Sequence, residues 1–190
     1  MEKVNQRIVV IEGPSGVGKD TIIKTLTEKY PDRFAKLVSV ATRAMRPDES
    51  QGNPYHFVNH EEFDKMLASG DIFEHTVRHG EKRGMSEKYI KAILAENKIP
   101  LKDCDIVGVN ALKSRFNDVK TIFITADKKS VEERLHKRGD MIPDIEQRLA
   151  DYDEYIKNAK YYDHVVENVD LQKTIDKILE IIYNWVYGKQ

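Results

Sequence analysis

The sequence predicts an α/β fold in which a mostly parallel sheet is covered by helices on both faces. Short runs that we interpret as strands occur at residues 8–11, 35–41, 99–107, 119–125 and 164–167. Segments with helical periodicity separate most of these runs, and a glycine-rich loop follows the first one. Alternation of this kind favours parallel strands, because a parallel connection needs a crossover and the crossover is usually a helix.

Size and composition limit the chain to a few classes of protein. Its 190 residues suit one domain with room for a small inserted lobe, and 40% hydrophobic residues are enough for a core. No apolar run approaches the roughly 18 residues of a membrane span, and no signal-peptide pattern opens the chain. Lys and Arg number 31 against 32 Asp and Glu, which argues against broad nucleic-acid binding. A single cysteine is typical of a reducing compartment, so we expect a cytoplasmic protein with no membrane or nucleic-acid partner.

The remaining elements follow from periodicity and from turn residues. A first helix ends before Pro31, a polar loop spans 42–54, and a capped helix begins after Ser86. Residues 55–84 are expected to form an inserted, partly antiparallel lobe. Its expected elements are a strand at 55–58, a helix at 61–69 and strands at 72–77 and 81–84. The expected later elements are helices at 111–116, 129–137, 145–159 and 171–185, with a proline-interrupted connection at 140–143.

The loop after the first strand has the composition of a phosphate-binding loop. It reads Gly13-Pro14-Ser15-Gly16-Val17-Gly18-Lys19, between the apolar strand 8–11 and a helix. Glycines allow successive backbone N–H groups to point at one anion, and the start of the following helix favours negative charge. Lys19 is positioned to reach the β- and γ-phosphates of a nucleotide. A glycine-rich turn without catalytic importance is the simpler alternative, but glycines, lysine and flanking pattern agree on phosphate binding.

One position departs from the usual pattern of such loops. The residue after the lysine is normally Ser or Thr, whose hydroxyl binds Mg²⁺, whereas here it is Asp20, followed by Thr21. A carboxylate is also a hard oxygen ligand suited to Mg²⁺. We therefore expect nucleotide binding with an unusual metal site that includes Asp20.

A second group of residues suits another phosphate and a base. Arg43, Arg46 and Tyr55 follow the second strand, and two guanidinium groups with a phenol can hold a phosphate. A solvated basic loop explains these residues equally well. Glu74 lies in an apolar strand, where its carboxylate could accept from two N–H groups of a purine or belong to a buried ion pair.

Two acidic residues are expected at the end of a central strand. If the strand runs over 99–107, Asp103 and Asp105 lie on one of its faces and Cys104 faces the core. Strand ends are where α/β folds bind ligands. One of the two acids, Asp103 in our prediction, could serve Mg²⁺ through water.

Three arginines form the last candidate group. Arg134 and Arg138 are four residues apart on one predicted helix, and Arg148 follows on the next helix across a proline-containing segment. Arginines on a movable segment can close over a phosphoryl group during its transfer and offset its charge. Salt bridges to the many nearby acidic residues are the alternative.

These four groups together resemble one family, the guanylate kinases, which transfer a phosphoryl group from ATP to GMP. The resemblance runs from about residue 7 to residue 179. Its carriers are the loop at 13–19, Ser39 with Thr42-Arg43 and Arg46, Tyr55-His56-Phe57-Val58, Glu61-Glu62-Phe63, Phe73-Glu74, Asp103-Cys104-Asp105, Arg134-Leu135, Arg138-Gly139 and Arg148-Leu149.

The resemblance implies a role for each group. It implies that Arg43, Arg46 and Tyr55 hold the acceptor phosphate, and that Ser39, Glu74 and Asp105 read guanine. Lys19 and the lid arginines Arg134, Arg138 and Arg148 would be catalytic. The implied organisation is one domain over 1–190, with a core at 1–41 and 86–190, a monophosphate-binding lobe at about 42–85 and a lid at about 138–148. ATP, a nucleoside monophosphate and Mg²⁺ are the implied ligands, and we expect a monomer or homodimer.

Two further positions differ from the family pattern. Lys82-Arg83-Gly84-Met85-Ser86 stands where the family usually has Tyr-Tyr-Gly-Thr-Ser, so that Arg83 replaces a phosphate-binding tyrosine and Met85 a hydroxyl that helps to read the purine. The Gly-Lys-Asp sequence around Asp20 resembles the ribose 1,5-bisphosphate phosphokinases. A kinase with a changed acceptor is therefore one alternative, and a non-catalytic protein-binding module is another. Tyr55, Glu74 and Asp105 together fit a purine acceptor better than a bare sugar phosphate.

Overall fold

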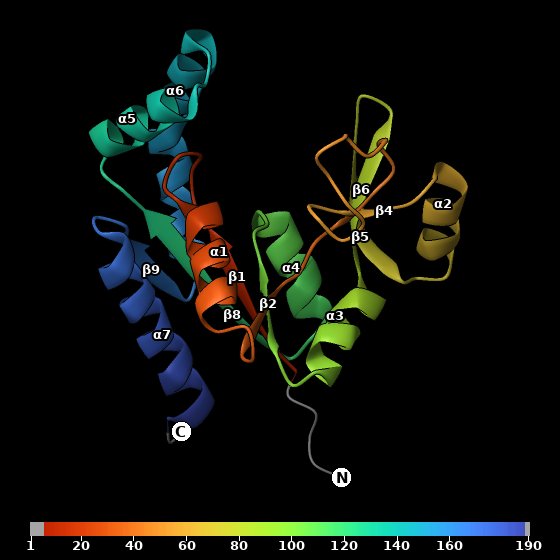
Figure 1. Ribbon diagram of the computed structural model, residues 1–190. Helices are drawn as coiled ribbons and strands as arrows, with labels where there is room; N and C mark the ends of the chain where they lie inside the picture. Colours follow the sequence, from red (N-terminus) through yellow and green to blue (C-terminus); the bar gives the residue numbers. More distant parts are fainter. Residues whose placement is uncertain (1–5, 189–190) are drawn as a thin grey trace.

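The computed structural model describes residues 6–188, and they form a central parallel sheet with a second, smaller sheet beside it (Figure 1). The central sheet has the order β2-β7-β1-β8-β9, and every neighbouring pair is parallel. Its strands are β1 (Arg7–Glu12), β2 (Phe34–Lys36), β7 (Ile99–Lys102), β8 (Asp118–Thr125) and β9 (His164–Glu167). The predicted α/β class with a mostly parallel sheet is confirmed.

Strand β1 is the middle of this sheet because its side chains are buried on both faces. Ile8, Val9, Val10 and Ile11 have no exposed surface, which is the pattern of an interior parallel strand. Val9 and Ile11 pack with α1 (Lys19–Lys29) and α7 (Leu171–Tyr187) on one face. Ile8 and Val10 pack with α3 (Glu87–Ala95) and α4 (Ile106–Arg115) on the other.

Two helices stand at the carboxyl end of the central sheet. They are α5 (Lys128–Arg138) and α6 (Ile142–Ile156), which is continued by the 3₁₀ helix η1 (Lys157–Tyr161). Figure 1 shows α5 and α6 beyond the start of α1, at the end of the sheet where β1 leads into its loop. Pro143 lies in the first turn of α6, where a missing N–H costs nothing, so it begins the helix instead of interrupting the chain before it.

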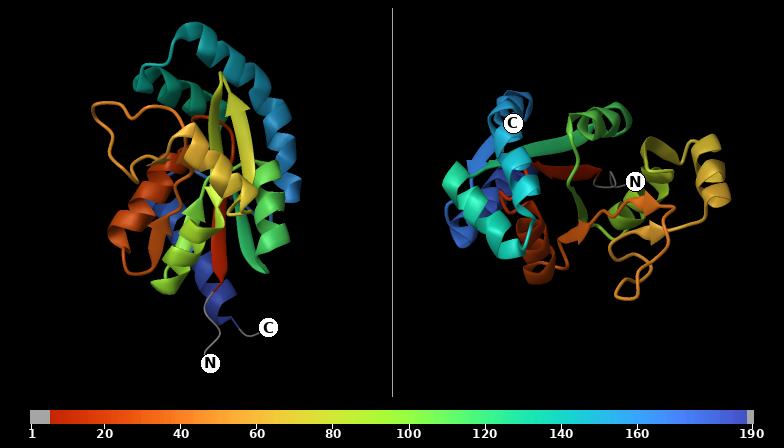
Figure 2. Two further views of the ribbon diagram at one scale, coloured as in Figure 1. Left: turned by 90° about the vertical axis from the view of Figure 1, so that its right-hand side faces the viewer. Right: turned by 90° about the horizontal axis from the view of Figure 1, so that it is seen from above.

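The second sheet has the order β4-β3-β6-β5 and carries one helix. Its strands are β3 (Val40–Ala41), β4 (His56–Phe57), β5 (Ile72–Arg78) and β6 (Glu81–Ser86), and the helix is α2 (His60–Ala68). β5 and β6 are antiparallel, as predicted. Phe63 of α2 is fully buried against Val40 and Ile72 and gives this part a small core of its own. Figure 2 shows the second sheet and α2 projecting to one side of the central sheet.

The predicted strand at 35–41 is divided between the two sheets. The Leu37 N–H donates to the Leu101 carbonyl of the central sheet at 2.9 Å, whereas the Ser39 carbonyl accepts from the His56 N–H of the second sheet at 3.0 Å. The chain changes hydrogen-bond partners between these two residues. Residues 37–39 therefore cross from one sheet to the other.

The predicted strand at 99–107 is too long. It ends at Lys102 because the Asp105 carboxylate accepts the Gly108 N–H at 3.0 Å and so begins α4 at Ile106, five residues before the predicted start at 111. The expectation that Asp103 and Asp105 share a strand face is wrong for this reason.

None of the helices within residues 6–188 combines the length and the apolar character needed to cross a membrane.

Candidate functional site

The glycine-rich loop turns tightly at the carboxyl end of β1. Gly13, Gly16 and Gly18 have φ values of 151°, 85° and 102°, which glycine adopts without strain. A Cβ atom on Gly13 would lie 2.1 Å from the carbonyl oxygen of Ile124 in the neighbouring strand β8. The loop therefore needs glycine at residue 13 both for its backbone angle and for its close approach to the sheet.

Lys19 is the first residue of α1, and its ammonium group lies over the loop. Its Nζ donates to the Pro14 carbonyl at 3.0 Å and also to the Gly13 carbonyl. The side chain is thus folded back along the loop, at the helix N-terminus where backbone N–H groups and the helix dipole favour an anion.

Asn168 anchors the same loop from the connection between β9 and α7. Its buried side chain donates to the Val17 carbonyl at 2.7 Å and accepts from the Thr174 hydroxyl at 3.0 Å. A Cβ atom on Gly18 would lie 2.6 Å from the Asn168 Nδ2. Asn168 is not among the residues predicted from the sequence, because it lies 151 residues from Val17 and belongs to no motif.

A cavity of about 280 Å³ lies between the loop and α5. Most of the predicted ATP-binding residues meet here with two of the predicted lid arginines, whereas Gly13, Pro14 and Val17 do not line the cavity. The lining residues are Ser15, Gly16, Gly18, Lys19, Asp20, Thr21, Arg134, Leu135 and Arg138. We call this space the donor cavity. Asp20 and Thr21 are exposed residues in the first turn of α1.

The three arginines predicted to form a lid contact the loop, its anchor Asn168 or Asp140. Arg134 donates to the Val17 carbonyl at 3.2 Å and to the Asn168 carbonyl at 2.9 Å. Arg148 donates to the Ser15 hydroxyl. The guanidinium groups of Arg138 and Arg148 both lie at Asp140, with Arg138 Nε 2.6 Å from Oδ1 and Arg148 Nε 3.6 Å from Oδ2.

Asp140 is therefore a shared anion for two of these arginines. Its side chain is only 12% exposed, and the hydrogen bond from Arg138 lowers the pKa of its carboxyl group. The salt-bridge interpretation of the sequence is thus confirmed for Arg138 and Arg148, which nevertheless also lie beside the phosphate loop.

Glu12 is a buried acid at the end of β1, directly before the glycine loop. It is 5% exposed and accepts a hydrogen bond from the Tyr155 hydroxyl of α6. Burial raises the pKa of Glu12, and the nearby Lys19 ammonium opposes that rise. Glu12 is not among the predicted site residues, although a charged residue at the end of an apolar strand is a signal visible in the sequence.

A second cavity of about 180 Å³ lies between β5 and β6 of the second sheet and residues 102–108, which follow and include the end of β7 in the central sheet. It brings together Ser39, Glu74, Arg83 and Asp105 from the predicted set with Thr76, Gly84, Met85, Lys102, Asp103, Cys104 and Gly108. We call it the acceptor cavity. Met85 is 2% exposed and belongs to the apolar cluster around β1. Burial, and then the charge of Asp105, raises the pKa of Glu74, while Lys102 lowers it.

Arg43, Tyr55 and Arg83 form a group next to this cavity. The guanidinium carbons of Arg43 and Arg83 lie 5.2 and 4.9 Å from the centre of the Tyr55 ring. Arg43 also forms a bidentate pair with Glu49, in which Nη1 and Nη2 donate to the two carboxylate oxygens at 2.7 Å and 2.5 Å. Arg46 is exposed, and its backbone N–H donates to Glu49 at 2.9 Å.

The two predicted magnesium ligands line different cavities. Asp20 lines the donor cavity, whereas Asp103 lines the acceptor cavity, where its carboxylate lies 3.8 Å from the Lys102 Nζ. Within residues 6–188, no three His, Cys, Asp or Glu side chains are grouped closely enough to hold a metal. Cys104 packs against the cluster around β1, and burial raises the pKa of its thiol.

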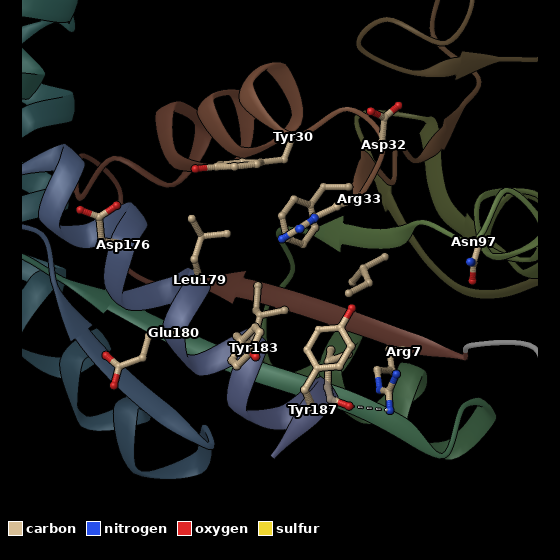
Figure 3. A pocket seen from close by; sticks show the side chains of 14 residues that line it. Arg7, Tyr30, Asp32, Arg33, Asn97, Asp176, Leu179, Glu180, Tyr183 and Tyr187 are labelled. Atoms are coloured by element: carbon tan, nitrogen blue, oxygen red, sulfur yellow. Dashed lines mark hydrogen bonds between the residues drawn. The ribbon is translucent and has the colours of Figure 1, made fainter. Parts of the chain in front are cut away.

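A further cavity of about 780 Å³ lies at the opposite end of β1 (Figure 3). Arg7 and Tyr30 line it with Tyr183 and Tyr187 of α7, and it contains none of the predicted site residues. Arg7 is already engaged there by Asp118 at 3.4 Å and by the Val186 carbonyl at 3.4 Å. The donor and acceptor cavities, in contrast, lie where β1 and β7 end, which is where parallel sheets bind ligands.

Known proteins are similar to this chain in sequence and in fold over almost its whole length. The family model for guanylate kinase matches residues 5–184. The guanylate kinase of Chlamydia felis is 37% identical over 180 residues, which are 93% of this chain and 87% of that protein. That of Symbiobacterium thermophilum is 33% identical over 178 residues, 92% of this chain and 83% of that protein. The crystal structure of guanylate kinase from Anaplasma phagocytophilum superimposes with a TM-score of 0.65 at 29% identity and covers 95% of this chain and 86% of that one. With a donor cavity at the glycine loop and this likeness along its length, the chain belongs to the guanylate kinase family of ATP-dependent kinases.

Proposed function

We propose that the chain transfers the γ-phosphoryl group of ATP to GMP or dGMP and yields GDP or dGDP. The observation that carries the proposal is the pair of cavities at the carboxyl end of the central sheet. One is built from the phosphate loop and the arginines of α5, and the other holds a half-buried glutamate beside a second arginine group.

In this proposal the donor cavity binds the phosphates of ATP. Backbone N–H groups of residues 13–18 and the start of α1 surround the anion, and Lys19 exchanges its carbonyl partners for phosphate oxygens. Mg²⁺ usually keeps several waters and is held by one or two carboxylates together with phosphates, so the exposed Asp20 in this cavity fits such an ion. When bound, Mg²⁺ neutralises part of the triphosphate charge.

The acceptor cavity binds the monophosphate substrate. Glu74 accepts from the N–H groups on the base, and Ser39 and Asp105 complete the polar lining. Arg43, Arg46, Arg83 and Tyr55 hold the phosphate, for which Arg43 must turn from Glu49. We propose that the second sheet with α2, about residues 42–85 of the lobe expected from the sequence, is the part that carries the monophosphate. Residues 138–148 between α5 and α6 would be the lid.

Transfer then needs positioning and charge compensation but no strong base, because a phosphate acceptor is already ionised. The two phosphates repel each other, and Lys19 with Arg134, Arg138 and Arg148 offsets that repulsion as the parts close and exclude water. All side chains named here belong to one chain. A monomer, or a homodimer with independent sites, is therefore sufficient.

A coupled assay for ADP with a panel of acceptors tests the proposal. The panel contains GMP, dGMP, AMP and ribose 1,5-bisphosphate, and the Lys19→Ala variant measures background. We expect GMP and dGMP to be the best substrates. Faster turnover of ribose 1,5-bisphosphate, or ATP binding with no turnover of any acceptor, would overturn it. The relatives' names give no support to a sugar-phosphate kinase or to a non-catalytic binding module.

A further inference from the structure

Lys102 is a buried cation in the acceptor cavity. None of the sequence motifs assigns it a role. It ends β7, pairs in register with Val10 of β1 and is 8% exposed. Its neighbour Leu101 belongs to the apolar cluster on one face of the sheet, so Lys102 points to the other face, which Val10 and Met85 share. An ammonium group in such surroundings is costly unless polar partners surround it.

The partners of Lys102 satisfy only part of its hydrogen-bonding capacity. Its Nζ donates to the Ser39 hydroxyl at 2.9 Å and lies 3.8 Å from the Asp103 carboxylate, too far for a full hydrogen bond. An ammonium group has three N–H donors. Among residues 6–188, the contact with Ser39 is its one hydrogen bond, so two donors remain for a ligand in the cavity.

The acidic side chains of the cavity accept hydrogen bonds, whereas Lys102 donates them. Glu74, Asp103 and Asp105 are acceptors, and Met85 offers an apolar wall with no hydroxyl. Arg83 is exposed and stacks on Tyr55 instead of lying in the buried part of the cavity. Lys102 is thus the buried donor among the described lining residues, next to a half-buried carboxylate at Glu74.

This arrangement matches one class of purine edge. A 6-oxopurine presents an acceptor oxygen at carbon 6 beside the N1–H donor, and guanine adds a 2-amino donor. Adenine presents a 6-amino donor beside an unprotonated N1, which would place donor against donor at Lys102 and acceptor against acceptor at Glu74. Polar groups that are left unpaired in a buried site weaken binding, so this arrangement disfavours adenine.

We propose that Lys102 is a specificity-determining residue that donates a hydrogen bond to the 6-oxo group of the acceptor base. It takes the place of the hydroxyl that Met85 does not supply. The inference rests on the proposed function and assigns the residue that recognises the 6-oxo group of its acceptor.

The experiment compares GMP with 6-thioguanosine 5′-monophosphate, which keeps both N–H donors but replaces the 6-oxygen by sulfur, a weak acceptor. Wild-type protein, Lys102→Met and the control Lys98→Met are assayed at saturating ATP. Lys98 precedes the same strand, and its ammonium pairs with Glu96 at 2.8 Å outside the cavity. We expect Lys102→Met to lower kcat/KM for GMP by about tenfold or more and that for the thio analogue by about threefold or less. Lys98→Met leaves the preference of the wild type unchanged.

The outcomes separate the inference from the function on which it rests. Equal losses for GMP and the thio analogue, or an unchanged kcat/KM for GMP, would overturn the role of Lys102 while the kinase activity stands. A wild-type protein that phosphorylates neither nucleotide would overturn the proposed function as well. Thermal unfolding and the KM for ATP monitor the fold. If Lys102→Met unfolds below the assay temperature, Lys102→Gln is measured in its place and must lose part of the same preference.

Discussion

Several charged side chains at the site have protein partners that a phosphate can replace. Lys19 donates to the Pro14 carbonyl, and the guanidinium group of Arg43 forms two hydrogen bonds to the Glu49 carboxylate. Such pairings keep the cationic groups near the positions where anions bind. The functional importance of each group can therefore be tested by removing one charge at a time.

Lys19→Ala is expected to reduce kcat by at least about 100-fold, because a preorganised cation at the transferred group is lost. The fold should persist, since the side chain is partly exposed and its hydrogen bonds within residues 6–188 go to loop carbonyls. Steady-state kinetics and thermal unfolding check both points. Lys24→Ala, on the exposed side of α1, is the control and should retain the wild-type rate. Near-native turnover by Lys19→Ala contradicts the mechanism.

Glu74→Gln is expected to raise the KM for GMP by roughly 10- to 100-fold, because the half-buried carboxylate that we propose as acceptor of the base N–H groups is replaced by a neutral amide. The KM for ATP should change by less than about twofold. Glu61→Gln on the exposed face of α2 serves as the matched control. A parallel rise in both KM values would remove Glu74 from the acceptor site.

Glu49 predicts a dependence of stability on acid pH. Its hydrogen bonds from Arg43 lower its pKa from 4.5 to about 2 in the folded protein. Because the folded pKa is depressed, the stabilisation is present above pH 4.5 and is lost as pH falls towards 2. Urea unfolding of wild type and Glu49→Gln between pH 7 and pH 2 measures the effect. The variant should lose less stability than the wild type on acidification, and equal slopes would contradict the assignment.

At the scale of the elements, the phosphate loop depends on how β1 and β8 lie against each other. Gly13 packs so closely on the end of β8 that any side chain would strike the Ile124 carbonyl. Gly13→Ala is therefore expected to cost about 3 kcal/mol or more, from backbone strain and overpacking together.

The matched control is Gly80→Ala, in the turn between β5 and β6. Gly80 also has a positive φ, of 81°, but a Cβ atom there meets nothing within 4 Å. Only the backbone strain remains, about 1 kcal/mol. Urea unfolding of the two variants gives the comparison, and similar losses would show that the approach to Ile124 is not what requires glycine at residue 13.

What could be predicted from the sequence was local, and what was missed depends on distant contacts. The loop at 13–19 and the antiparallel pair β5–β6 follow from short patterns of glycine, charge and alternation. The end of β7 was predicted wrongly because Asp105 caps a helix, so Ile106 and Val107 belong to α4 and not to the strand.

The missed site residues illustrate the same limit. Asn168 donates a hydrogen bond to Val17, 151 residues away in the sequence, and Lys102 donates one to Ser39, 63 residues away. Neither spacing is visible as a motif. Glu12 and Lys102 did carry one usable signal, since each is a charge at the end of an apolar strand.

At the scale of the whole molecule, the two sheets are joined by two short crossings. The chain leaves the central sheet through residues 37–39 and returns where β6 leads into α3 at Ser86. Figures 1 and 2 show the second sheet projecting from the core on these connections. Motion of one sheet relative to the other is the expected way to bring the two phosphates together.

Small-angle X-ray scattering tests this expectation. Addition of GMP together with a non-hydrolysable ATP analogue should reduce the radius of gyration of the wild type. Lys19→Ala, which weakens the donor site, should show a smaller reduction at the same ligand concentrations. An unchanged radius of gyration in the wild type would rule out closure of the two parts as rigid bodies.

The acceptor cavity draws its lining from both sides of these crossings, and that has a consequence for engineering. Glu74 and Met85 arrive with the second sheet, whereas Lys102 and Asp105 belong to the strand and helix of the core. A chimera that received only residues 40–86 from a relative would inherit half of a recognition surface. Transfer of nucleobase preference between members of this family therefore requires substitutions in both the second sheet and the core. Exchange of one segment alone should yield enzymes of relaxed selectivity.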